Sequence, residues 1–187
     1  MPSCAARRFA LLGLFVVPGL SAHADEVTIC YNYGCYARAP VDYSEAQLDA
    51  LHQLLAAAAD AAAERDAIST VIGRMYAIAG EQAPVWRDKG GNYADGGENG
   101  KMDCIDHSTN TTAFLRLLQA HGWLRFHEVL DPLLRTRFFF ADHWAARIRE
   151  RETQKVYVVD SWFFDNGHPA AVLPVEDWLA GKTPNVQ

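Results

Sequence analysis

Cys104, His143 and Asp160 are the residues whose types and spacing best suit covalent chemistry in this chain. Cys104 directly follows Asp103, a residue type favoured at helix N-caps, so we expect it at the first position of a helix. Backbone N–H groups there lack partners and the helix dipole favours an anion, and a thiol in that place becomes a better nucleophile. Because the carboxylates of Asp103 and Asp106 oppose ionisation, the thiolate needs a cationic partner.

His143 is the best candidate for that partner. It begins one predicted strand, residues 143–149, and Asp160 lies near the end of the next, residues 155–163, after a polar turn. A turn centred between residues 151 and 152 pairs residues whose numbers sum to 303, which places His143 directly opposite Asp160 with Cβ atoms about 5 Å apart. A slip of one residue would send one side chain to the other face, so the prediction depends on the turn.

A thiol, an imidazole and a carboxylate in this arrangement form a catalytic triad. Cys104 would attack a carbonyl carbon, His143 would move the proton, and Asp160 would orient the imidazole and stabilise its charge. The backbone N–H of Cys104 and a second donor would hold the oxyanion. The second donor is expected from residues 88–103, whose five glycines predict a loop with its backbone against a site. The glycine spacing does not fit a phosphate-binding loop.

The order of these motifs resembles the transglutaminase-like superfamily of papain-like cysteine enzymes. The resemblance covers residues 100–164 and rests on Cys104, then His-Trp-Ala from residue 143, then Val-Val-Asp-Ser-Trp up to residue 162. The longer pattern Met-Asp-Cys-Ile-Asp-His also resembles exported bacterial proteins of undefined function. The family places its triad on a helix start and two successive strands, which matches Cys104, His143 and Asp160, and its flanking aromatics match Trp144 and Trp162.

The resemblance implies a reaction at an amide or ester bond through a thioester intermediate, with a peptide or protein amide as substrate. Hydrolysis is slightly preferred over crosslinking because water is abundant outside the cytosol. The papain-type Gln before the cysteine has no clear counterpart, since Gln82 lies 22 residues upstream of Cys104 and Asn99 is nearer. Some family members have lost catalysis, so a non-catalytic exported binding or scaffold protein is the alternative.

His107 is a second histidine near the nucleophile. It lies three residues after Cys104, on the same helix face, and could line the site or serve as the base. Its only obvious orienting acid is Asp103, so we expect it to face solvent in the first helical turn. Zinc usually takes ligands from several segments or from a His-Glu-x-x-His helix, a spacing that Asp103, Cys104, Asp106 and His107 lack. We predict no metal and no cofactor.

Residues 1–24 have the pattern of a secretory signal peptide. Arg7 and Arg8 precede an apolar run of about twelve residues, and Ala22 and Ala24 form a small-x-small cleavage site. The run is too short for a membrane span of about 20 residues, so no stable membrane anchor is expected. We predict export, to the periplasm or beyond, after cleavage near Ala24. The remaining 187 − 24 = 163 residues carry a charge of 15 − 23 = −8, which argues against nucleic acid as a partner.

Export also changes the meaning of the four cysteines. Cys4 leaves with the signal peptide. Cys30 and Cys35 bracket the turn-prone Tyr-Asn-Tyr-Gly, and thiols in an oxidising compartment tend to pair, so we predict a local disulfide. The alternative is two unpaired thiols in a mobile segment. Cys104 is then the odd cysteine, either paired with another molecule or kept reactive.

Helical patterns come before strand patterns in this chain. Residues 25–43 are expected to be irregular, residues 44–80 an Ala-rich helical scaffold that breaks near 60–66, and residues 104–121 a second helix. Predicted strands follow at 124–130, 136–141, 143–149, 155–163 and 170–174, with a brief helix at 175–180. This order predicts an α+β fold in which N-terminal helices pack on an antiparallel sheet. One domain would span residues 25–187, with its catalytic core at 100–180; the oligomeric state is not indicated.

Overall fold

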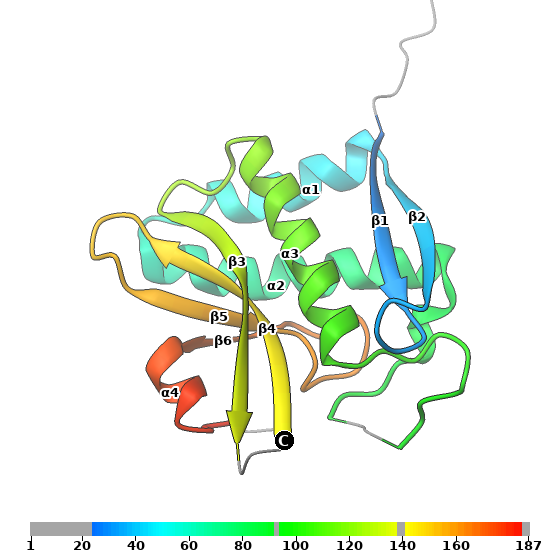
Figure 1. The fold of residues 1–187 in the computed structure, drawn as a ribbon. Coiled ribbons are helices and arrows are strands. Elements are labelled where there is room, and N and C mark those ends of the chain that lie inside the picture. The colour runs from blue at the N-terminus through cyan, green and yellow to red at the C-terminus, as the bar shows by residue number, and fades with distance from the viewer. Residues whose placement is uncertain (1–23, 92–93, 138–140, 185–187) are drawn as a thin grey trace, which may run out of the picture.

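The structure is a computed structural model that describes residues 24–91, 94–137 and 141–184. The predicted signal peptide, apart from Ala24, and residues 138–140 of the predicted 136–141 strand lie outside these ranges. The elements are β1 (Asp25–Tyr31), β2 (Ala37–Tyr43), α1 (Glu45–Ala56), α2 (Ala61–Gln82), the 3-10 helix η1 (Pro84–Arg87), α3 (Cys104–Ala120), β3 (His127–Arg137), β4 (Ala141–Glu150), β5 (Val156–Asp160), β6 (Ala171–Pro174) and α4 (Val175–Leu179) (Figure 1). In these ranges no helix has the length and apolarity needed to cross a membrane.

Both sheets are antiparallel. Four strands pair in the order β3-β4-β5-β6, and β1 pairs with β2 in a separate hairpin. The predicted mixture of helices with an antiparallel sheet is therefore confirmed, but the expectation that residues 25–43 are irregular is wrong. Pro40 argued against a strand there, yet a two-stranded hairpin has only edge strands, and an edge strand tolerates the missing N–H of proline.

The helical scaffold divides at a polar cap. Ser44 and Gln47 form a capping box at the start of α1, in which the Gln47 N–H donates to Ser44 Oγ (3.4 Å) and the Ser44 N–H donates to Gln47 Oε1 (2.9 Å). Asp60 caps α2, because its Oδ1 accepts from the Ala63 N–H at 2.8 Å. The break therefore lies at residues 57–60, slightly before the predicted position, and α2 continues through Gly80 to Gln82.

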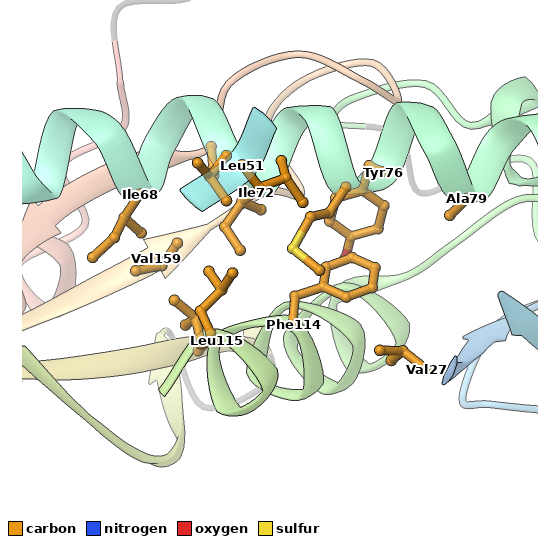
Figure 2. Close-up of a cluster of buried hydrophobic side chains, with 14 of the residues drawn as sticks. Val27, Leu51, Ile68, Ile72, Tyr76, Ala79, Phe114, Leu115 and Val159 are labelled. Atoms are coloured by element: carbon orange, nitrogen blue, oxygen red, sulfur yellow. The ribbon is translucent and has the colours of Figure 1, made fainter. Parts of the chain in front are cut away.

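The main core lies between α2, α3 and one face of the four-stranded sheet (Figure 2). Tyr76 of α2 meets Phe114 of α3, with their rings edge to face at 5.1 Å. Ile68 and Ile72 of the same helix point toward Val159 and Leu115. Burial of each large apolar side chain of this kind stabilises the fold by about 1.5–3 kcal/mol. The helix that begins at Cys104 is thus held by its apolar face, which leaves its N-terminus free to build a site.

The other face of the four-stranded sheet has its own small cover. Trp178 of α4 is fully buried there and packs with Ala145 of β4 and Val158 of β5. Residues of one parity along β4 and β5 face this cover, and residues of the other parity face the main core. His143 and Asp160 belong to the parity of Ala145 and Val158, so they share the Trp178 face.

Candidate functional site

Cys104 occupies the first position of α3, as its neighbour predicted. Asp103 caps the helix, with its Oδ1 accepting from the Ile105 N–H (3.0 Å) and the Asp106 N–H (2.9 Å). The N–H of Cys104 donates to no residue in the part of the chain that the structure describes. The side chain is partly exposed and packs against the cluster of Trp162 and Phe163. A partly open thiol with a free N–H beside it is the arrangement expected of a nucleophile with one oxyanion donor.

The register of the β4–β5 hairpin differs from the prediction. Ala146 lies opposite Val159, so paired residue numbers sum to 305, and Asp160 falls beside Ala145 instead of His143. The predicted turn centre was wrong because the hairpin loop comprises residues 151–154, closed by the Glu150 N–H donating to the Lys155 carbonyl at 2.8 Å. The error is an even number of residues, and strand side chains alternate with period two. His143 and Asp160 therefore still share a face, as diagonal neighbours.

His143 and Asp160 are in direct contact. The distance from His143 Nε2 to Asp160 Oδ2 is 2.7 Å, and both side chains are buried. Two further donors reach the same carboxylate: Trp178 Nε1 donates to Oδ2 at 2.9 Å, and the Trp162 N–H donates to Oδ1 at 3.2 Å. A buried carboxylate needs such partners to offset its lost hydration. Trp178 was missed by the sequence analysis, since nothing in its local pattern indicates a partner 18 residues earlier.

The surroundings of His143 favour its charged form. Trp162, Phe163 and Trp178 enclose the ring, with centroid distances of 4.9, 5.7 and 5.7 Å. Burial lowers the pKa of His143, but the hydrogen bonds and charges of Asp160 and Cys104 outweigh it and raise the pKa to about 9. Since Nε2 is hydrogen-bonded to Asp160, the interaction with Cys104 is on the side of Nδ1, which has no other hydrogen-bond partner within the described ranges. The thiol thus lies near enough to influence the ring, and Nδ1 is directed to it alone.

The glycine-rich segment lies against the chain that follows Asp160. The Gly91 N–H donates to the Trp162 carbonyl at 2.8 Å, and the Gly90 N–H donates to Asp165 Oδ1 at 3.1 Å. A Cβ on Gly90 would come within 2.4 Å of Phe164 Cα, so no side chain fits at this position. The described part of the segment has the close backbone approach that its glycines predicted.

Cys30 and Cys35 form the predicted disulfide, and their loop sits on the start of α3. The Cys35 N–H donates to Asp106 Oδ1 at 2.6 Å, and the Gly34 N–H donates to Asp103 Oδ2 at 3.0 Å. Both acids beside the nucleophile are thus engaged by backbone donors. Burial raises the pKa of Asp106 to about 6, so this carboxyl loses its negative charge only as the pH falls through that value.

The remaining predicted site-lining residues have different places. Asn99 Oδ1 accepts from Asn32 Nδ2 at 3.3 Å, so this amide belongs to the junction with the disulfide loop and contacts none of the described triad residues. Trp144 lies opposite Leu134 on β3 and follows His143 directly, so its side chain points to the other face of β4. Of the predicted flanking aromatics, only Trp162 meets the His143 ring.

His107 is buried, and the expectation that it faces solvent is wrong. Its Nε2 lies 2.9 Å from Asp88 Oδ2 and its Nδ1 lies 2.8 Å from Ser161 Oγ. Asp88 supplies the orienting acid that the sequence analysis did not find, because this residue lies 19 positions earlier in a loop. Both ring nitrogens of His107 are engaged by Asp88 and Ser161, whereas Nδ1 of His143 interacts with Cys104 alone, so the geometry favours His143 as the base.

One group of three close ligand atoms occurs in the described ranges: Cys30, Cys35 and Asp106. Both of its sulfur atoms are joined in the disulfide, so they offer no thiolate to a metal.

Comparison of the chain with protein-family models, with curated proteins and with solved structures gives no match. Membership in the transglutaminase-like superfamily is therefore a proposal, and it rests on the motif order and on the geometry around Cys104.

Proposed function

We propose that this protein is an exported cysteine enzyme with a transglutaminase-like core, acting on an amide or ester bond through a thioester at Cys104. The observation that carries the proposal is the 2.7 Å contact between His143 and Asp160, with the imidazole close enough to Cys104 for the two to interact. The packing of α3 against β4 (Figure 1) agrees with that core.

The chemistry follows from the protonation states. In the proposed scheme His143, whose pKa is raised to about 9, is an imidazolium at neutral pH and pairs with the thiolate form of Cys104. The sulfur attacks the carbonyl carbon, and the free N–H of Cys104 stabilises the oxyanion. Nδ1 of His143 then gives its proton to the departing amine or alcohol, which leaves a thioester. Water, deprotonated by the neutral imidazole, attacks the thioester, releases the acid and restores the thiolate and the imidazolium. Asp160 orients His143 throughout.

A peptide or protein amide is the proposed substrate, and water is slightly preferred over an amine as the acceptor. No cofactor takes part in this scheme. The disulfide between Cys30 and Cys35 and the absence of a spanning helix among the described residues are compatible with export. Cleavage of residues 1–24 as a signal peptide belongs to the proposal.

The test is the pH dependence of Cys104 alkylation by iodoacetamide, since the two other cysteines of the mature chain are joined in a disulfide. Wild-type protein is expected to react below pH 7, and His143→Gln and Asp160→Asn to react roughly ten- to a hundredfold more slowly at pH 6. His168→Gln, at an exposed histidine, is the matched control and should behave as wild type.

A second arm asks for the covalent intermediate. Incubation with p-nitrophenyl acetate should acetylate Cys104, as seen by mass spectrometry, and the acetyl group should leave again in wild type. Cys104→Ser should give no label in either arm. Two results together would overturn the proposal that the protein is an enzyme: an alkylation midpoint at about pH 8.5, as for an ordinary thiol, and no acetylation of Cys104. The protein would then be a non-catalytic exported binding or scaffold protein.

A further inference from the structure

A network of buried polar side chains lies beneath the candidate site. His107 contacts Asp88 and Ser161, and Ser161 Oγ lies 2.9 Å from Thr111 Oγ1 and 3.3 Å from the Tyr76 hydroxyl. Tyr76 in turn donates to the His107 carbonyl at 3.1 Å. All five side chains are buried, and they come from α2, from the loop after η1, from α3 and from the residue after β5.

The hydrogen bonds of this network form one consistent set. A carboxylate only accepts, so the Nε2 that faces Asp88 carries a proton. Tyr76 donates to the His107 carbonyl and Ser161 donates to the Tyr76 hydroxyl, while His107 Nδ1 and the Thr111 hydroxyl each lie within hydrogen-bond distance of Ser161 Oγ. Every buried hydroxyl of the network thus has a hydrogen-bond partner. Such complete satisfaction is what makes a buried polar network specify a single arrangement.

The network connects the two segments that carry Cys104 and Asp160. On one side Asp88 Oδ1 accepts from the Met102 N–H at 2.7 Å, two residues before Cys104, and His107 lies one helical turn after Cys104. On the other side Ser161 directly follows Asp160. Cys104 and Asp160 belong to different elements, so their relative position depends on what connects α3 to the end of β5.

We propose that His107 is a positioning residue for the cysteine chemistry: through Asp88 and Ser161 it holds the start of α3 in register with the end of β5, and so Cys104 with His143 and Asp160. The inference rests on the proposed function. A misplacement of about 1 Å at a reacting group can cost about 100-fold in rate, so a connection of this kind influences reactivity without touching substrate.

Two conservative variants separate the two halves of the connection. His107→Asn places an amide near Nδ1 and can keep the contact with Ser161, whereas His107→Gln places one near Nε2 and can keep the contact with Asp88. Each is expected to move the midpoint of Cys104 alkylation toward the ordinary value of about 8.5 and to slow the reaction at pH 6 at least fivefold. Circular dichroism and thermal melting are recorded for every variant.

The matched control is a second buried histidine away from the site. His127 bonds Glu64 at 2.8 Å and is fully buried, so His127→Asn should lower the melting temperature and leave the alkylation profile unchanged. If both His107 variants lose stability but retain the wild-type profile, His107 supports only the fold and the inference is wrong.

Ser161→Ala decides the question if the His107 variants do not fold. It removes one hydroxyl from the same network and should shift the pH profile of Cys104 alkylation in the same direction. An unchanged profile in this folded variant would overturn the inference. A failure of the proposed function has a different signature. The wild-type protein itself would then show an ordinary profile that His143→Gln does not alter.

Discussion

Two buried histidine–carboxylate pairs in this molecule have similar geometry and different surroundings. His143 and Asp160 meet at 2.7 Å, and His127 and Glu64 meet at 2.8 Å. In the second pair the other nitrogen of His127 lies 3.3 Å from Arg65 Nη1, and Arg65 continues to Glu150 at 2.8 Å. In the first pair the other nitrogen of His143 has no hydrogen-bond partner in the described chain apart from its interaction with the partly exposed Cys104.

The difference separates a pair whose polar atoms are all engaged within the fold from one that suits the proposed catalytic role. Burial raises the pKa of Glu64, but hydrogen bonds from His127 and from the N–H groups of Arg125 and Phe126 outweigh it and lower the pKa. Every polar atom there is committed, so the pair joins α2 to β3 and offers nothing to a substrate. His143 has the same kind of acid on one side and Cys104 on the other.

The largest effect is expected when the pair of His127 and Glu64 is broken. Glu64→Ala should lower the free energy of unfolding by about 3–5 kcal/mol, because it leaves the buried His127 and two partly buried backbone N–H groups without their acceptor. Urea titration followed by circular dichroism measures this loss. The alkylation profile of Cys104 should remain that of wild type in the folded protein. A profile shifted as in Asp160→Asn would contradict the division between the two pairs.

The next largest effect is the pH dependence of the stability that His143 contributes. The folded-state pKa of His143, about 9, lies above the ordinary value of 6.5, so folding favours the protonated ring. Its contribution to stability, on the order of 3 kcal/mol, is complete below pH 6.5 and is lost as the pH rises through about 9. Urea titrations at pH 6 and pH 10 should therefore show a larger difference between wild type and His143→Gln at pH 6. An equal difference at both pH values would show that folding does not raise the pKa of His143.

Local signals in the sequence were enough to place Cys104 at the start of a helix. Phe114 and Leu115 belong to the apolar face that makes this segment helical, and aspartate is a favoured residue type at the position before a helix. Asp103 therefore marks where α3 begins. The shared face of His143 and Asp160 was also predictable, because an even error in register preserves it. The register itself was not, since the loop includes Gln154 in a left-handed conformation (φ 59°) that its residue type does not predict.

Connections between distant segments could not be predicted. His107 was expected in solvent because its partners Asp88 and Ser161 lie 19 and 54 positions away, and only the packing of α3 brings them together. The same holds for Trp178, which reaches Asp160 from a five-residue helix. Polar groups that meet across elements have no periodicity to reveal them, whereas caps and apolar faces repeat within a single element.

The smallest effect sharpens the comparison at Asp160. Trp178→Phe keeps the ring over Val158 and removes the N–H that donates to Asp160 Oδ2. Loss of one buried hydrogen bond should lower the free energy of unfolding by about 1 kcal/mol. With one donor fewer, the carboxylate interacts more strongly with the imidazolium, so the pKa of His143 should rise further, as histidine NMR titration would detect. Trp123→Phe, in a ring stacked between His52 and His121, is the matched control and should leave that titration unchanged. An unchanged His143 titration in Trp178→Phe would mean that Trp178 acts on the pair only by packing.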